Sequence, residues 1–461
     1  MKKKILIYLY RNFSLRYLID TKLIDKLSQE FEVILLTKDN YVDYYKNFLN
    51  KNIKIIGYNW YQFERSRKNK FFNKFLILIR KLSSGKKYSD NKTVRVREIQ
   101  YKENYKKQKI FFYSCLLISK ILNSSLFLRK IFNNLEKLYL NTKFFDNLLN
   151  LHKPKAVIIG SCCIDHDAYI SVSAKKLNIK LLSIIYSWDN PSTKGSAICK
   201  PDRVFSWNKS MTEDIENFFE IKKDKIYECG ILHWSNYEKD LPEIVSNQIK
   251  TIAFFSSAPS NFENAYDNLI DILNYQNSKR KIRVLARMHP SFFVENKYFN
   301  QNLEIQKNIL ERYGNKISFI NPQIISCDNK SDFLMDLKED LKDIKKILTK
   351  SDVIISQYST ILIETLILKK PLINYSTGLF RNTPFTKKEI FSMMHHLNKF
   401  LRYKLVADID NKKSMYKELD KLLDGNINFD NYRKFFLDNI SSIKKDNIET
   451  IKKELIRFID N

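Results

Sequence analysis

Glycine is scarce in this chain, with only eight glycines among 461 residues. No G-x-G-x-x-G or G-x-x-x-x-G-K-[ST] pattern occurs, and both patterns need several glycines close together. The scarcity argues against a standard NAD enzyme and against a P-loop NTPase.

Cysteine and long apolar runs are also lacking. None of the six cysteines forms a C-x-x-C pair or a His/Cys cluster, which is typical of reduced thiols in a cytosolic protein. No apolar run approaches the ~20 residues that a membrane span needs. The N-terminal run Ile5–Tyr10 is too short for a signal peptide and reads as a first strand. We therefore expect a cytoplasmic protein.

Acidic residues are in deficit, and the formal net charge is +29. Residues 61–110 alone hold 16 Lys and Arg against 4 Asp and Glu. Such a patch attracts nucleic acid, anionic lipid or anionic saccharide, and a solvated insertion without a partner would have the same composition.

The basic patch lies within residues 59–147, which are helical in tendency and rich in aromatic residues. Segments Phe71–Leu82 and Ile110–Phe132 are basic and amphipathic, as helices that lie on anionic membrane surfaces are. Alternatively, their apolar faces are ordinary core. We expect contact with the inner face of the cytoplasmic membrane, and no nucleic acid because no nucleic-acid-binding motif accompanies the charge.

The remainder of the chain alternates strands and helices, which predicts an α/β fold with two Rossmann-like domains facing a cleft. The expected domains are residues 1–240 with the basic insertion, residues 241–385, and a helical C-terminal segment at 386–461. The expected strands are Lys4–Tyr10, Phe31–Leu36, Ile53–Gly57, Ala156–Ile159, Lys180–Ile185, Arg203–Ser206, Ile226–Cys229, Thr251–Phe255, Arg283–Met288, Ile317–Ile320, Val353–Ile355 and Leu372–Tyr375.

Segment 351–375, SDVIISQYSTILIETLILKKPLINY, reads as strand, tight loop, helix, proline stop and strand. Ser359 and Thr360 fall at the start of the helix, where hydroxyls and free N–H groups suit a phosphate, although helix caps use the same residues. Glu364, about one turn into the helix, is placed to hold ribose hydroxyls.

Three other polar clusters follow predicted strands. Ser256 and Ser257 suit a diphosphate, or simply begin a helix. Arg287, His289 and Pro290 end a strand, and a histidine there suits phosphate, a pyrimidine or an acid role.

The loop SWDNPSTKG at 187–195 is richer than turn chemistry requires, although an Asn-Pro turn anchored by a tryptophan would explain part of it. Asp189 could accept a proton from an acceptor hydroxyl, and Trp188, Asn190 and Lys194 could contact the acceptor. Asp167, in the group Asp165-His166-Asp167, is a second candidate base. Adjacent residues cannot easily share one ion, so no metal site is expected.

His289-Pro290 together with SDVIISQYSTILIETLILKKPLINY resembles the donor half of GT-B glycosyltransferases. The likeness is to bacterial surface-polymer groups: CDP-glycerol glycerophosphotransferases, Kdo transferases and bacterial sialyltransferases. It spans about residues 150–380. It implies a metal-independent transfer from a CMP-, CDP- or UDP-linked donor to a hydroxyl of a saccharide or lipid-linked acceptor, without a further cofactor.

Within that resemblance Ser256, Ser257, Arg287, His289, Pro290, Ser359, Thr360 and Glu364 would bind the donor. A sugar is the expected transferred group, for a surface polysaccharide. Glycerophosphate transfer and UDP-sugar 2-epimerisation are alternatives on the same fold. A basic membrane- or nucleic-acid-binding protein without catalysis is a third.

Overall fold

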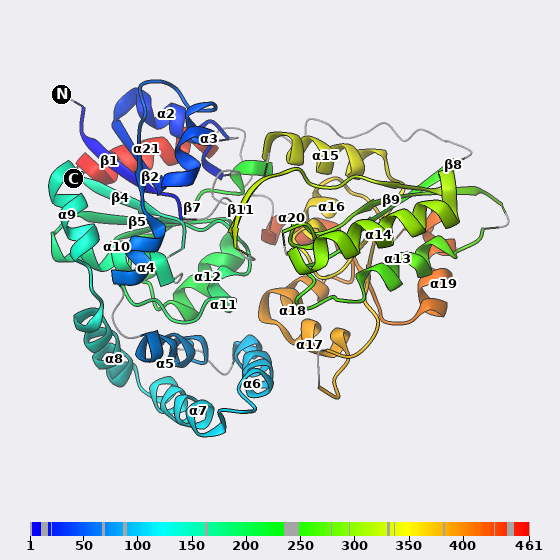
Figure 1. Ribbon diagram of the computed structural model, residues 1–461, viewed down its shortest axis with the longest axis horizontal. Coiled ribbons are helices and arrows are strands. Elements are labelled where there is room, and N and C mark those ends of the chain that lie inside the picture. Colours follow the sequence, from blue (N-terminus) through cyan, green and yellow to red (C-terminus); the bar gives the residue numbers. More distant parts are fainter. Residues whose placement is uncertain are drawn as a thin grey trace. The chain divides into compact units, whose positions relative to one another are not determined.

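The computed structural model describes residues 2–10, 17–19, 21–66, 70–85, 90–161, 165–234, 249–277, 279–294, 296–329, 332–335, 337–380, 383–427, 429–439 and 447–460 (Figure 1). The chain forms two compact units. Unit 1 is Met1–Ser235 with Met394–His396 and Leu437–Asn461, and unit 2 is Asn236–Met393 with Leu397–Phe436. The expected boundary at 240/241 lies outside the described residues, and the expected segment 386–461 is divided between the two units.

Unit 1 is built on a seven-stranded parallel sheet whose order is β3-β2-β1-β4-β5-β6-β7. Its central strands are buried apolar runs such as Lys4–Tyr8, because a parallel sheet is covered on both faces. The strands are β1 (Lys4–Tyr8), β2 (Glu32–Lys38), β3 (Lys54–Tyr58), β4 (Ala156–Ile159), β5 (Lys180–Ile184), β6 (Arg203–Ser206) and β7 (Ile226–Glu228).

Helices cover this sheet, and the last helix of the chain is among them. The Lys452 Nζ atom of that helix lies 3.4 Å from an oxygen of Glu30, so the C-terminal end joins the first domain. The helices are α2 (Leu23–Glu30), α3 (Val42–Lys46), α9 (Lys143–His152), α10 (Asp165–Lys176), α11 (Asn190–Thr193), α12 (Lys209–Phe218) and α21 (Asn447–Asp460).

The basic insertion is helical, as predicted. It contains α4 (Trp60–Ser66), α5 (Lys70–Lys81), α6 (Lys92–Asn104), α7 (Lys109–Ser124) and α8 (Leu126–Tyr139). The helices α5, α7 and α8 pack on one another around Leu78, Ile79, Phe112 and Cys115. The predicted helix over 110–132 is two helices, because the chain is extended at Ser125, whose hydroxyl accepts the Leu128 N–H at 3.3 Å.

Unit 2 repeats the architecture with a six-stranded parallel sheet of order β10-β9-β8-β13-β14-β15. Its strands are β8 (Ile249–Phe255), β9 (Lys281–Arg287), β10 (Ile317–Phe319), β13 (Val353–Ser356), β14 (Leu372–Tyr375) and β15 (Ala407–Ile409). A separate antiparallel pair comprises β11 (Ile324–Asn329) and β12 (Asp332–Met335). Both large sheets have the doubly wound order, which confirms the prediction of two Rossmann-like domains.

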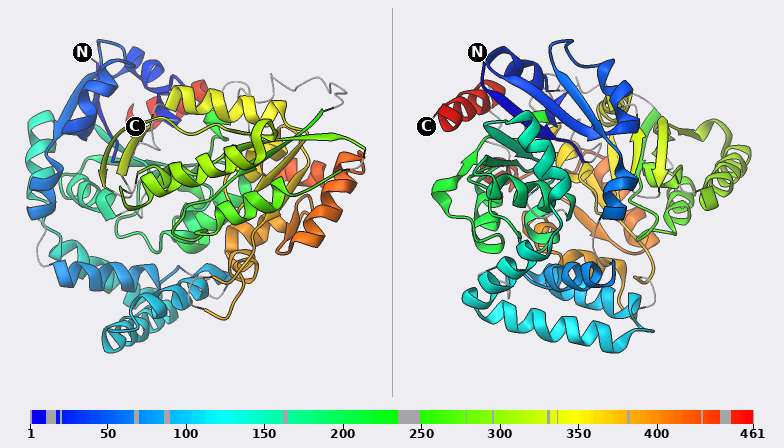
Figure 2. Two further views of the ribbon diagram at one scale, coloured as in Figure 1. Left: turned by 45° about the vertical axis from the view of Figure 1, so that its right-hand side comes forward. Right: turned by 60° about the vertical axis from the view of Figure 1, so that its left-hand side comes forward.

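The helices of unit 2 flank its sheet in the views of Figure 2. They are α13 (Ala265–Leu273), α14 (Asn296–Tyr313), α15 (Leu337–Lys350), α16 (Ile361–Ile367), α17 (Lys387–Met393), α18 (His395–Leu401, whose first two residues belong to unit 1), α19 (Lys412–Leu423) and α20 (Tyr432–Asn439, whose last three residues belong to unit 1). Strand β15 lies inside the tail that was expected to be helical. It has three residues, too few to show a period, and it forms by pairing with β14.

Candidate functional site

The strand order of unit 2 reverses between β8 and β13. Both strands are parallel to β9, so their carboxyl ends meet at one edge of the sheet. Ser256 and Ser257 follow β8, His289 follows β9, and Gln357 follows β13. Open α/β sheets bind ligands at such a reversal, outside the carboxyl ends of the strands.

Hydrogen bonds tie these three loops together. The His289 N–H donates to Ser256 Oγ at 2.7 Å, and the Ser256 N–H donates to the Arg287 carbonyl at 3.1 Å. The Ser257 N–H donates to Gln357 Oε1 at 3.3 Å. The structure therefore brings together Ser256, Ser257 and His289, which the sequence predicted from separate motifs, and adds Gln357.

The His289 side chain is held in one tautomer. Its Nδ1 accepts the N–H of Ser291 at 3.1 Å, so in the neutral ring the proton is on Nε2. Burial lowers the pKa of His289 to about 4, although Asp340 acts in the opposite direction. At neutral pH the ring is therefore an uncharged donor through Nε2, and this hydrogen makes no hydrogen bond to the part of the chain that the structure describes.

Gln357 is a site candidate that the sequence reasoning missed. Its side chain is fully buried, and its Nε2 has no hydrogen-bond partner among the described residues. A buried donor without a partner costs about 1–3 kcal/mol, so such an atom is a candidate ligand contact. The signal in the sequence is its position as the first residue after a central strand, in a segment that the sequence predicts only as a tight loop.

Ser359 and Thr360 lie at the same sheet edge, after β13. The Ser359 hydroxyl is 3.2 Å from Ser356 Oγ and accepts the Ile361 N–H at 3.2 Å, so it caps the start of α16. Thr360 makes no side-chain cap bond. Tyr358 holds the bend before them with φ of 43°, in the left-handed region, and its N–H donates to Asn374 Oδ1 at 2.8 Å.

Two of the expected donor contacts point into the protein rather than to its surface. Arg287 is buried, pairs with the equally buried Asp340, and donates to the Ile320 carbonyl at 3.0 Å. Glu364 is 1% exposed. Pro290 begins a short turn after His289 and is half-buried. As the chain stands, Arg287 supports the strand that carries His289, and Glu364 is not open to solvent.

In unit 1, the loop after β5 folds around Asp189 and contains one helical turn, α11, where the sequence predicts a loop. Asp189 accepts hydrogen bonds from the hydroxyls of Ser187 and of Thr193, the latter at 2.6 Å. Lys194 Nζ lies 3.7 Å from Asp189 Oδ2. Burial alone would raise the pKa of Asp189, but Lys194, His396 and the two hydroxyls hold it well below its ordinary value.

His396 joins this loop from the start of α18, a segment in which the sequence showed no chemistry. Its ring meets Trp188 edge-on, with centroids 4.8 Å apart, and its Nδ1 lies 3.1 Å from Ser192 Oγ. Ser192 Oγ also lies 3.2 Å from the Asp189 carbonyl, which can only accept. The hydroxyl therefore donates to the carbonyl, His396 Nδ1 carries the hydrogen toward Ser192, and His396 Nε2 is left with a lone pair.

The position of His396 is fixed by its neighbour. The His395 N–H donates to Thr93 Oγ1 at 2.8 Å, and His395 Nε2 lies 3.0 Å from Asp214 Oδ1. Burial lowers the pKa of His396 to about 4, with Asp189 opposing, so the ring is neutral at pH 7. Asn190, which is buried, begins the turn and accepts the Lys194 N–H through its carbonyl at 3.2 Å.

The second candidate base, Asp167, lies in the first turn of α10, after β4, the strand that pairs with β5. It is 3% exposed, and its Oδ2 accepts the Ser161 N–H at 2.9 Å after β4. No hydrogen bond within the described chain joins it to Asp189. Asp167 therefore holds the β4–α10 connection, at the same carboxyl edge of the sheet of unit 1 as the Asp189 loop, because β4 and β5 are neighbouring parallel strands.

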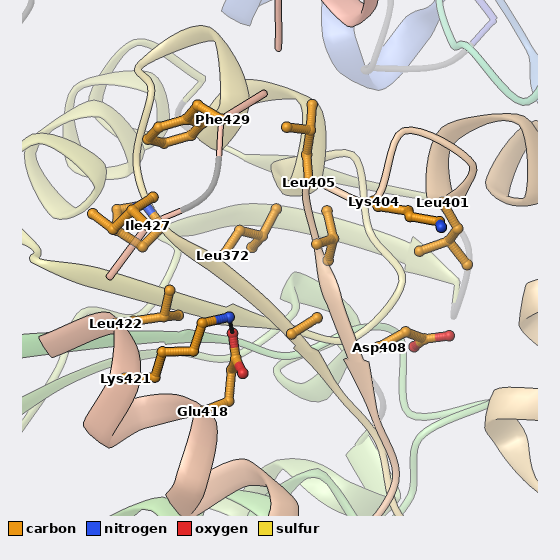
Figure 3. Close-up of a pocket in the computed structure, with 13 residues that line it drawn as sticks. Leu372, Leu401, Lys404, Leu405, Asp408, Glu418, Lys421, Leu422, Ile427 and Phe429 are labelled. Carbon is orange, nitrogen blue, oxygen red and sulfur yellow. Dashed lines mark hydrogen bonds and ion pairs between the residues drawn. The ribbon is translucent and has the colours of Figure 1, made fainter. Parts of the chain in front are cut away.

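A cavity of about 330 Å³ lies at the opposite edge of the sheet of unit 2 (Figure 3). Leu372 and Ala407, which line it, are the first residues of β14 and β15, so it opens at the amino ends of these strands. Glu418 and Lys421 pair at 3.1 Å on its wall. The cavity is thus separate from the carboxyl edge that carries His289.

Comparison with known proteins finds a family model that matches part of the chain, and solved structures with a similar fold. Residues 280–386 match the model of the CDP-Glycerol:Poly(glycerophosphate) glycerophosphotransferase family. This segment contains His289, Gln357, Ser359 and Thr360, but not Ser256 or the Asp189 loop. No curated protein matches the chain.

Solved structures match over nearly the whole chain at low identity. A UDP-N-acetylglucosamine 2-epimerase of Listeria monocytogenes, described as putative, is 11% identical with a TM-score of 0.52, over 98% of this chain and 95% of that one. The UDP-GlcNAc 2-epimerase of Methanocaldococcus jannaschii is 12% identical with a TM-score of 0.48, over 99% and 100%. The wall teichoic acid polymerase TagF is 12% identical with a TM-score of 0.46, over 100% and 90%.

The first of these likenesses supports the fold and nothing finer. Together with the two doubly wound sheets, it confirms the fold expected from the sequence motifs. The chain therefore has a GT-B fold, and residues 280–386 of its second unit carry a domain that matches the CDP-glycerol glycerophosphotransferase family.

Proposed function

We propose that this protein transfers glycerol phosphate from a CDP-glycerol-like donor to a hydroxyl of a cell-surface polymer. The supporting observation is that the match to the glycerophosphotransferase family covers the segment that places His289, Gln357 and Ser359 at one sheet edge. The proposal replaces the sugar transfer favoured in the sequence analysis with the alternative given there.

The reaction requires no redox partner. The acceptor oxygen forms a bond to the β-phosphorus of CDP-glycerol, and the bond between that phosphorus and the bridging oxygen of CMP breaks. CMP leaves with the bridging oxygen, and the acceptor hydroxyl gives up its proton. The enzyme must therefore stabilise charge on the leaving phosphate and accept one proton.

For the leaving phosphate we propose His289. Its Nε2–H is a fixed, uncharged donor, because Nδ1 is committed to the Ser291 N–H. Gln357 Nε2 supplies a second donor, held by the bond from the Ser257 N–H to its Oε1. Preorganised donors of this kind stabilise developing charge without reorganising during the reaction.

For the proton we propose His396 rather than Asp189. A carboxylate whose pKa lies well below its ordinary value is a weak base, and both of its oxygens already accept hydroxyl hydrogens. His396 has an available lone pair on Nε2 and is neutral at pH 7. Asp189 then stabilises the imidazolium that forms, and Lys194 and Trp188 are left as acceptor contacts.

The test is transfer from CDP-glycerol labelled with ³²P at the β-phosphorus to a poly(glycerol phosphate) acceptor. We expect label in the polymer and unlabelled CMP in solution. Transfer of a sugar from a UDP- or CMP-sugar with CDP-glycerol unused would overturn the proposal in favour of glycosyl transfer. Interconversion of a UDP-sugar in the absence of acceptor would overturn it in favour of epimerisation.

Two variants connect that reaction to the residues. His289→Ala should abolish transfer, whereas His152→Ala, at the end of α9 and before β4, should retain it. Equal activity of the two variants would remove His289 from the mechanism.

A further inference from the structure

Helices α7 and α8 each carry a second apolar stripe on the side opposite their packed face. Along α7, Phe112, Cys115, Leu116 and Leu122 are buried. The exposed apolar residues of α7 fall within an arc of about 80° on the other side, at 100° per residue. They are Ile110, Tyr113, Leu117 and Ile121, with Ile110 87% and Leu117 62% exposed.

The same arrangement recurs in α8. Its packed face carries the partly buried Leu128 and Phe132 and the buried Arg129 and Glu136. Its exposed stripe is Phe127, Ile131, Leu135 and Leu138, with Leu138 83% exposed. With Leu126, these two short helices contribute nine of the 21 exposed large apolar residues of the described chain, so the stripes are a concentration and not the ordinary scatter of a surface.

The charge around the stripes has one sign. Lys106, Lys107, Lys109, Lys120 and Lys130 are exposed, and the last three flank the stripes on the helical wheel. Helix α7 contains no acidic residue, and the single acidic residue of α8, Glu136, is buried against Arg80. An apolar stripe bordered by lysines and without exposed carboxylates complements an anionic lipid surface, since the lysine stems follow the acyl boundary while the ammonium groups reach the headgroups.

The helix α5 is a contrast within the same insertion. Its apolar residues Leu78 and Ile79 are buried in the core that α5 forms with α7, and its one exposed large apolar residue among those described, Phe71, has its ring 5.2 Å from that of Phe111 of α7. In Figures 1 and 2, α7 lies at the outer edge of unit 1, with α5 between it and the helices that cover the sheet. Packing therefore explains the amphipathic pattern of α5. In α7 and α8 it explains the apolar residues of the packed face but not the exposed apolar stripes.

We propose that the α7–α8 face, defined as the nine exposed apolar residues and the five lysines named above, docks on the surface of an anionic bilayer. The helices would lie in the plane of the interface, at the depth of the headgroups. Among the described residues no helix is both long and apolar enough to cross a membrane. The inference does not rest on the transfer reaction proposed above.

Vesicle flotation tests the proposal on the full chain. We compare vesicles of phosphatidylcholine alone with vesicles that contain 30% phosphatidylglycerol. The wild type should float with the anionic vesicles, and its binding should weaken about fivefold for each flanking lysine replaced by glutamine, the effect of one basic residue near a charged surface. Leu117→Glu with Leu138→Glu should reduce binding to anionic vesicles at least tenfold.

The matched control is Leu151→Glu with Leu437→Glu, which changes two leucines of similar exposure outside this face, 76% and 58% exposed. Control and stripe variants should melt at the wild-type temperature, and the control should still bind. Absence of wild-type flotation, or equal binding by the stripe variant, would overturn the proposal. So would a wild-type dimer in solution that the stripe variant converts to monomer, because the face would then be covered by a second copy.

Discussion

The two ring nitrogens of His289 have separable tasks, and two substitutions divide them. Nδ1 accepts the Ser291 N–H at 3.1 Å and closes a short turn, whereas Nε2–H is the donor assigned to the ligand. In His289→Asn the side-chain oxygen can keep the bond to Ser291 while the donor at the Nε2 position is lost. In His289→Gln the side-chain amide can reach the Nε2 position while the bond to Ser291 is lost.

His289→Gln should therefore be the more active of the two variants, and His289→Asn the more stable. A hydrogen bond to a charged phosphate is worth about 1.5–3 kcal/mol, so His289→Asn should lower kcat/KM by about 10- to 150-fold relative to His289→Gln. Loss of a cap costs about 1 kcal/mol, so His289→Gln should be the less stable of the two by about that amount. Steady-state transfer from CDP-glycerol and urea unfolding measure the two quantities on the same preparations.

The reasoning would be refuted if the same variant were higher in both kcat/KM and the free energy of unfolding. If His289→Asn were at least as active as His289→Gln, Nε2 would have no role in transfer, and His289 would be only the cap of its turn. Equal loss of activity in both variants, with equal loss of stability, would carry the same conclusion.

Three further outcomes follow from the buried groups. Asp340→Ala removes the closer carboxylate of the buried Arg287 guanidinium, leaving Asp343 Oδ2 at 3.9 Å, and should cost about 3–5 kcal/mol in urea unfolding, with unchanged nucleotide affinity in the fraction that folds. His289 and His396 have folded pKa values of about 4 against an ordinary value of 6.5, so the unfolded chain binds more protons between these pH values. Above pH 6.5 the two histidines should therefore not lower the free energy of unfolding, and it should fall as the pH drops toward 4. The fall should be at most about 3 kcal/mol per histidine, and less because both rings are partly exposed. A double His-to-Asn variant should show a weaker fall over this pH range. His396→Ala should lower kcat by about 10²–10⁴-fold with little change in donor affinity, and an unchanged kcat would remove it as the proton acceptor.

The strands of both domains could be predicted from sequence because parallel sheets are buried on both faces and read as short apolar runs. Ala156–Ile159, Arg203–Ser206 and Leu372–Tyr375 have the predicted bounds. Strand β15 could not be predicted in this way, since three residues show no period. The break between α7 and α8 was missed, although Asn123, Ser124 and Ser125 interrupt the apolar and basic pattern there and serine is a favoured N-cap residue.

The candidate site was predictable only in part. Ser256, Ser257 and His289 follow strands, and parallel strands carry such residues to one edge whatever their separation in sequence. Gln357 was not distinguished, because burial of its amide depends on the bond from Ser257, a hundred residues away. His396 was invisible for a similar reason: its contacts with Trp188 and Ser192 join segments about two hundred residues apart. Conversely, Arg287 is a residue type that often contacts phosphate, but here its side chain pairs with Asp340. No local sequence pattern indicates that ion pair.

The central claim is that the donor binds at the carboxyl edge of the second sheet, and hydrogen–deuterium exchange of the full chain with and without CDP-glycerol tests it most directly. The account predicts slower exchange in residues 256–260, 289–292 and 357–361, with no change at the amino-edge cavity around Leu372 and Ala407. Protection at that cavity, or protection confined to unit 1, would contradict it.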